Sequence, residues 1–368
     1  MNKQHVHYFD PLRLIAAISV IYIHTSADLR RCAIQADWHL SNIFAGLSFT
    51  AVSLFFMMSG YLILGSEKTA DVSYLLKKRL PHLLIPLVGW TVLVALWYPM
   101  VTDGFSVQGI YNYLIRSLHT PAWVHFWYLY TLIALYLISP ILYGGIRALD
   151  KKGHIFVFVI ICAISLKSML QAVLPENLQV FLQIDLLNKL SIFDGAVALF
   201  ILGYYLGKTP KHISNTLLAL IAGGTLVIIV LGTYLATLKN GVYYDAFLKQ
   251  TSGFEVILSA CIFLLFKQNC NKPLGFFKTV PFVPLSLSIY LMHGIFLAML
   301  IPKMPIDSFV DTVWVTCLVF VACYLVMKTA ATIKPICYLA TGMTYENACN
   351  SCNWIYTYRK LTARKEDL

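Results

Sequence analysis

Long apolar runs, each about the length of a membrane span, constrain this chain more than any other feature. A helix that crosses a ~30 Å hydrocarbon core needs about 20 residues, and such runs recur along nearly all 368 residues. Hydrophobic residues make up 59% of the chain and charged residues only 12%, whereas soluble domains average roughly 25% charged residues. The sequence therefore predicts an all-α polytopic integral membrane protein.

The apolar runs place ten expected transmembrane helices. They lie near residues 11–27, 43–64, 81–101, 125–143, 155–174, 191–207, 213–236, 253–267, 281–301 and 311–330. Pro281, Pro284 and Pro302 interrupt the ninth run, which makes its shape the least regular. The gaps leave no room for a separate soluble domain, so we expect one membrane domain over residues 1–334 and a tail over 335–368.

The distribution of Lys and Arg residues orients these helices, because such residues accumulate in cytoplasmic loops. With the N-terminus inside, most of the 28 Lys and Arg residues fall on the cytoplasmic side, and both termini are predicted to be cytoplasmic. Because the charges are spread over membrane-flanking loops, the net charge of +11 does not imply a nucleic-acid partner.

Cysteine usage predicts no disulfide framework, because Cys32 alone among nine cysteines falls in an expected outside loop. Cys349 and Cys352 form a CxxC in the tail, either as metal ligands with other residues or as a reduced, inert pair. The sequence contains no second pair, which favours the inert interpretation, and we expect no metal.

The first expected helix lies in the segment FDPLRLIAAISVIYIHTSA, residues 9–27, and carries Asp10, Arg13 and His24. Arg13 and His24 are eleven residues apart, close to three helical turns, and Asp10 precedes Arg13 by about one turn. All three are therefore expected on one face, with His24 ~16 Å along the axis from Arg13. The bland alternatives are an interfacial Asp10–Arg13 ion pair and a hydrogen-bonded packing histidine.

A functional His24 has defined chemistry, because an imidazole at that depth can act as a general base or carry an acyl group. A signal peptide is the competing interpretation of the same stretch, since Arg13, the apolar run 14–23 and the small Thr25 and Ala27 imitate its three regions. Cleavage there would remove His24.

A basic cluster precedes the third expected helix in SYLLKKRLPHLLIP, residues 73–86. Lys77 and Lys78 are explained by the positive-inside rule alone. Arg79 and His82 are spaced to share one helical face at the cytoplasmic mouth, where Arg79 suits the phosphates of an anionic cofactor.

Two further stretches combine histidine with aromatic or hydroxyl side chains. His125 and Trp127 begin the fourth expected helix, where an aromatic belt and a sugar-stacking surface are both open interpretations. His293 lies in the ninth helix near Ser288 and Tyr290, either as a site residue or as a link between helices.

Three small or acidic positions in other helices have structural interpretations. Gly60, next to Ser59, is read as a close-packing position. Glu255 and Asp194 are expected to face the protein interior, because a carboxylate exposed to lipid is costly.

Taken together, the motifs resemble those of the acyltransferase-3 family of polytopic membrane acyltransferases. The match follows in order through FDPLRLIAAISVIYIH, SLFFMMSGYLI, RLPHLLIP and HFWYLYTLIALYLISPIL, with a weaker fifth motif at LSLSIYLMHGIF. It spans roughly residues 9–330. The sequence departs from the family pattern at His82, where the second arginine of an R-x-x-R signature is usual, and at Ser53, where a proline is usual.

The resemblance implies ten core helices and transfer of an acyl group from cytoplasmic acyl-CoA, here acetyl-CoA, to a sugar hydroxyl on a surface or lipid-linked glycan. It makes His24 the essential histidine, with Arg13 as its companion and Asp10 beside them. Donor binding is expected from Arg79, His82 and Lys78, and acceptor binding from His125, Trp127 and His293. The other expected partners are membrane lipids.

Two other functions compete with the enzyme. A transporter or flippase of a lipid-linked glycan would also line its pathway with polar groups, although the sequence shows no inverted repeat. A purely structural membrane partner would leave the aligned Asp10, Arg13 and His24 unexplained. Sequence patterns do not decide between acetyl, succinyl and other acyl groups, nor fix the oligomeric state.

Overall fold

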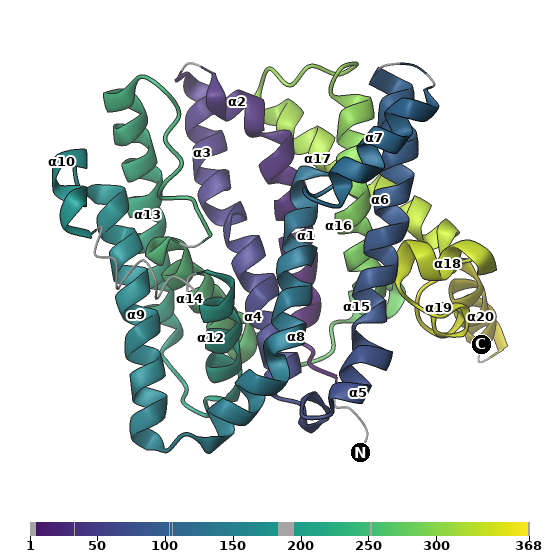
Figure 1. The fold of residues 1–368 in the computed structure, drawn as a ribbon, viewed down its shortest axis with the longest axis horizontal. Coiled ribbons are helices and arrows are strands. Elements are labelled where there is room, and N and C mark those ends of the chain that lie inside the picture. The colour runs from purple at the N-terminus through teal and green to yellow at the C-terminus, as the bar shows by residue number, and fades with distance from the viewer. Residues whose placement is uncertain are drawn as a thin grey trace. The chain divides into compact units, whose positions relative to one another are not determined.

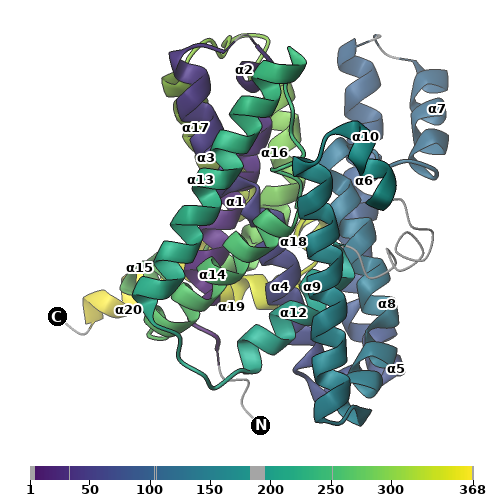
Figure 2. The same cartoon turned by 90° about the vertical axis from the view of Figure 1, so that its left-hand side faces the viewer.

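The protein is described by a computed structural model that covers residues 5–32, 34–102, 104, 106–182, 195–250 and 252–366. Every regular element among these residues is a helix, which confirms the all-α class (Figures 1 and 2). The chain divides into two compact units. The first unit comprises residues 1–71, 137–273 and 306–314, and the second comprises 72–136, 274–305 and 315–368.

The first unit is built from long apolar helices and short connecting turns. Its helices are α1 (Phe9–Thr25), α2 (Ala27–Arg31), α3 (Ala36–Ser48), α4 (Thr50–Leu64), α9 (Lys151–Val173), α10 (Glu176–Gln179), α12 (Ala196–Lys208), α13 (Asn215–Asn240) and α14 (Gly253–Asn269). Helix α12 packs on α4, α13 packs on α14, and α1 packs on both α3 and α4. Phe247, Phe254 and Leu258 lie in its hydrophobic core.

Close packing of α4 against α12 depends on glycine. A Cβ at Gly60 would lie 1.8 Å from the carbonyl oxygen of Phe200, and one at Gly203 would lie 2.1 Å from that of Met57. Any side chain at either position would therefore force the two helices apart. The expected packing role of Gly60 is confirmed.

The second unit contains α5 (Val72–Tyr74), α6 (Pro81–Thr102), α7 (Val107–Ser117), α15 (Gly275–Thr279), α16 (Ser286–Leu300), α18 (Lys334–Thr341), α19 (Tyr345–Ser351) and α20 (Trp354–Glu366). Helices α8 (Trp127–Ala148) and α17 (Phe309–Ala330) run from one unit into the other. Pro284 lies in a 3₁₀ turn that precedes α16, so the regular helix begins at Ser286 and not at residue 281, where the expected span began.

Seven helical stretches of the described chain are long and apolar enough to cross a membrane: 36–64, 72–102, 124–148, 151–173, 215–240, 283–300 and 309–330. The three other expected spans are also helical, but α1 and α14 have 17 residues each and α12 has 13. The protein is therefore a multi-pass membrane protein. The count of ten spans and the cytoplasmic placement of both termini stay predictions.

The tail forms three helices that belong to the second unit. Trp90 of α6 donates from Nε1 to the carbonyl oxygen of Ala340 at 3.1 Å, and His82 donates from Nδ1 to that of Gly342 at 2.5 Å. Helix α18 thus packs on α6 (Figure 1). All nine cysteines of the chain are reduced, and burial raises the pKa of the Cys352 thiol to about 11. Such a thiol is a poor nucleophile at neutral pH.

Candidate functional site

Helix α1 of the first unit carries three of the predicted site residues, Asp10, Arg13 and His24. Asp10 lies in the first turn and is buried, and His24 lies in the last turn and is partly exposed. The helix is unbroken between them, so eleven residues separate Arg13 from His24 by ~16 Å along the axis. The polar groups therefore occupy both ends of one apolar helix.

The carboxylate of Asp10 pairs with His5, which the sequence did not indicate as a site residue. His5 Nε2 lies 2.7 Å from Asp10 Oδ2, whereas the guanidinium of Arg13 lies 5.9 Å from the centre of the Phe9 ring. Potential ligand atoms of His5, His7 and Asp10 all lie within 4.8 Å of one another. Two imidazoles and a carboxylate are donors that zinc accepts, so the expectation of no metal stays a prediction.

Arg30 is a buried cation close to His24 in the chain, and it is the clearest residue that sequence reasoning missed. Its side chain donates to the carbonyl oxygen of Ile23 at 2.9 Å, to Ser26 Oγ at 3.1 Å and to the Tyr243 hydroxyl at 2.7 Å. The residue is 4% exposed. In the sequence it is indistinguishable from Arg31, the last residue of α2, whose side chain is 72% exposed.

Glu255 at the start of α14 is fully buried, as expected for an intramembrane carboxyl group. Among the described residues, neither of its carboxyl oxygens has a hydrogen-bond partner. Asp194, the other carboxyl expected inside, lies outside the described residues.

In the second unit, two predicted site histidines lie side by side. The rings of His125 and His293 are 4.2 Å apart between centroids, and both residues are buried. His293 Nδ1 donates to the carbonyl oxygen of Tyr290 at 2.5 Å, and His125 Nε2 donates to that of Leu291 at 3.3 Å. Because a carbonyl oxygen only accepts, these contacts place a proton on Nδ1 of His293 and on Nε2 of His125.

A glycine makes this histidine pair possible. A Cβ at Gly294 would lie 2.5 Å from His125 Cε1 and 2.7 Å from Trp123 Nε1. The segment before α8 therefore reaches α16 only because residue 294 has no side chain. Trp127 begins α8 and is partly exposed, with its ring edge-on to that of Tyr128.

The predicted donor-binding residues lie where the second unit departs from regular α-helix. Residues Leu75–Arg79 form a π-helical turn, which contains Lys78 and Arg79, and α6 begins just after it. Such turns are rare and are often found at functional sites. Lys78 is exposed, Arg79 is partly exposed with its guanidinium 5.5 Å from the centre of the Tyr74 ring, and His82 is bonded to the tail.

The apolar helices, the buried histidine pair and the buried side chains of Asp10, Arg30 and Glu255 define a class: integral membrane proteins with a polar interior, which includes both enzymes and transporters. Comparison with known families decides between them. The family model for the acyltransferase domain of the acyltransferase-3 family matches residues 6–328 of the chain. The chain belongs to this family and is a membrane acyltransferase.

Individual relatives are distant. The chain is 25% identical over 235 residues to nodulation protein 10 of Rhizobium leguminosarum bv. viciae. The aligned residues make up 63% of this chain and 59% of that protein. No solved structure matches the chain. The family assignment therefore rests on the family model. The donor, the acceptor and the roles of the site residues are assigned from the residues themselves.

Proposed function

We propose that this protein is an O-acetyltransferase of the bacterial inner membrane, which moves an acetyl group from cytoplasmic acetyl-CoA to a hydroxyl of a cell-surface or lipid-linked polysaccharide. The observation that carries the proposal is the placement of His24 in the last turn of α1, partly exposed and beside the backbone that Arg30 holds. The residue is thus not fully enclosed, unlike the two buried histidines of the second unit.

The proposed chemistry is attack of the sugar hydroxyl on the thioester carbonyl carbon. His24 accepts the hydroxyl proton, the new carbon–oxygen bond forms, and the carbon–sulfur bond breaks to release coenzyme A, which takes up a proton as a thiol. In the second form of the same reaction, His24 itself carries the acetyl group between donor and acceptor. Arg13 and Asp10, at the other end of α1, are assigned a positioning and electrostatic role.

Donor binding is assigned to Lys78, Arg79 and His82. Coenzyme A is polyanionic, and arginine offers paired donors that match phosphate geometry, with lysine as an added point charge. The π-helical turn presents Lys78 and Arg79 just before the start of α6. His82 Nδ1 is bonded to Gly342, so its contribution to the donor is made through Nε2.

Acceptor binding is assigned to His125, Trp127 and His293. Trp127 is partly exposed and offers a ring face to a sugar, whereas the buried histidine pair offers a fixed pattern of ring nitrogens. The sequence motifs are most like those of the acetyltransferase that modifies enterobacterial common antigen. That glycan is our candidate acceptor.

The test uses the purified full-length protein in liposomes with radiolabelled acetyl-CoA and a lipid-linked glycan fraction. We expect His24→Ala to lose at least ~10²-fold of the transfer rate, the lower bound for general acid–base catalysis. His119→Ala is the matched control, because His119 is an exposed loop histidine, and we expect it to match the unsubstituted protein.

The possible results separate the enzyme from the role of its histidine. Equal transfer by both variants would remove His24 from the chemistry while keeping the enzyme. Transfer from succinyl-CoA but not acetyl-CoA would change the donor. No transfer to any acceptor, together with no protection by acetyl-CoA against thermal unfolding, would overturn the proposal in favour of a transporter.

A further inference from the structure

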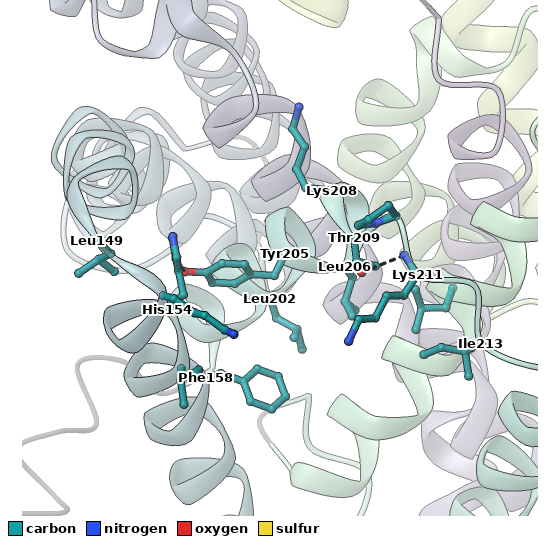
Figure 3. Close-up of a pocket in the computed structure, with 14 residues that line it drawn as sticks. Leu149, His154, Phe158, Leu202, Tyr205, Leu206, Lys208, Thr209, Lys211 and Ile213 are labelled. Atoms are coloured by element: carbon teal, nitrogen blue, oxygen red, sulfur yellow. Dashed lines mark hydrogen bonds between the residues drawn. The ribbon is translucent and has the colours of Figure 1, made fainter.

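A cavity of about 920 Å³ opens in the first unit between α9, α12 and the segment that follows α12 (Figure 3). This volume is within the ~300–1,000 Å³ that small-molecule sites occupy. None of the residues assigned to donor, acceptor or acetyl transfer lines it. An inference about this cavity therefore goes beyond the proposed function and does not depend on it.

The rim of the cavity is positively charged. Lys151, Lys208 and Lys211 line it, all three are exposed, and none forms an ion pair with any residue that the structure describes. Asp150 is the adjacent carboxylate in the chain, but it accepts a hydrogen bond from the backbone N–H of Gly153 at 2.8 Å as the N-cap of α9. Three lysines without a carboxylate partner among the described residues therefore lie at one opening, and the ammonium group of Lys208 also lies 5.9 Å from the centre of the Tyr61 ring.

The wall below the rim is apolar. Ile155 and Phe158 of α9 remain 55% and 50% exposed, on a helix that is long and apolar enough to cross a membrane. Leu202 and Leu206 of α12 line the same cavity (Figure 3). Exposed apolar side chains on such a helix face lipid, so the cavity opens toward the hydrocarbon of the bilayer.

A hydrogen bond between two helices holds the cavity in shape. His154 Nδ1 and the Tyr205 hydroxyl are 2.8 Å apart and join α9 to α12 beside the lysines (Figure 3). The apolar wall offers few polar partners to a soluble nucleotide. The anionic group that fits this rim therefore belongs to a molecule with an apolar body.

We propose that this cavity binds an anionic phospholipid of the bilayer. Its phosphate lies among Lys151, Lys208 and Lys211, and an acyl chain lies along Ile155 and Phe158. Basic pockets between membrane helices are a recognised way of holding acidic lipid headgroups. The positive-inside pattern assigns these lysines to the cytoplasmic face, which places the lipid in the inner leaflet.

The experiment measures lipid binding to the full-length protein in neutral detergent by native mass spectrometry, with phosphatidylglycerol and phosphatidylcholine as probes. A lysine near the membrane surface contributes roughly fivefold to the binding of an acidic lipid. We therefore expect the triple variant Lys151→Gln, Lys208→Gln and Lys211→Gln to bind phosphatidylglycerol on the order of 100-fold more weakly.

The matched control removes three exposed lysines of the same unit outside the cavity, Lys239→Gln, Lys249→Gln and Lys272→Gln. Both triple variants lose the same charge, and thermal unfolding without lipid checks that both are folded. The expected result is weak binding by the cavity variant and unchanged binding by the control.

Three outcomes would overturn the proposal. Equal loss in both triple variants would mean that net charge alone attracts the lipid. Equal affinity of the unsubstituted protein for phosphatidylglycerol and phosphatidylcholine would mean that the lysines do not distinguish an anionic headgroup from a zwitterionic one. Displacement of phosphatidylglycerol from the lysines by inorganic pyrophosphate, with no effect of Phe158→Ala, would assign the rim to a soluble phosphate.

Discussion

The two units of this protein differ in how they hold their candidate site histidines. In the first unit, His24 is partly exposed and three lysines surround an open cavity. In the second unit, His125 and His293 are buried and donate to backbone carbonyl oxygens, and His82 donates to the tail. The difference teaches which histidine to test first, because His24 keeps some exposure whereas each buried ring already donates one nitrogen to a carbonyl oxygen.

The largest effect is expected from Arg30, the buried cation of the first unit. Arg30→Ala leaves the carbonyl oxygen of Ile23 and the Tyr243 hydroxyl buried without their donor, so we expect the free energy of unfolding to fall by about 3 kcal/mol. Denaturant unfolding in detergent measures this. Arg31→Ala is the matched control and should change stability little, since its pair with Asp28 is long and exposed.

If Arg30→Ala and Arg31→Ala were equally stable, the hydrogen bonds of Arg30 would not stabilise the first unit near His24.

A smaller effect is expected in the histidine pair of the second unit. Tyr290 donates its hydroxyl proton to the carbonyl oxygen of His125, so Tyr290→Phe removes one buried hydrogen bond and should cost about 1 kcal/mol of stability. The acetyl-transfer rate per folded molecule should remain unchanged. Tyr130→Phe, at an exposed position of α8, is the control for loss of a hydroxyl.

A transfer rate that falls far more than stability would show that Tyr290 holds the histidine pair in the geometry that acceptor binding requires. The pair would then need the same first test as His24.

The smallest effect concerns the reactivity of one thiol. Because burial raises the pKa of Cys352 to about 11, its thiolate is scarce at pH 8 and becomes abundant only as the pH rises toward 11. Alkylation of a variant that retains Cys352 alone should therefore be slow at pH 8 and accelerate with pH. A variant that retains exposed Cys32 alone gives the reference rate, and equal rates at pH 8 would show that the tail opens.

Features that depend on composition and period were predictable from the sequence. The helical class, the packing role of Gly60 and the burial of Glu255 follow from apolar length and from the cost of polar groups in lipid. These rules act locally, so they need no knowledge of which helices meet.

Features that depend on contacts between distant segments were not predictable. Nothing in the sequence separates buried Arg30 from exposed Arg31, because the difference arises from Tyr243, more than 200 residues away. The pairing of Asp10 with His5, and the cavity between α9 and α12, depend likewise on how segments pack. The roles assigned to His24, Arg79 and the other site residues stay predictions.

The docking of the tail on α6 affects how membrane topology can be measured. Reporter enzymes are commonly fused after truncated membrane proteins, and a fusion at residue 334 would remove the carbonyl oxygens that His82 and Trp90 use in the intact chain. The third span would then carry two unsatisfied donors while its orientation was being read. Fusions placed after residue 366 keep both acceptors, and are the ones from which the sidedness of the termini should be taken.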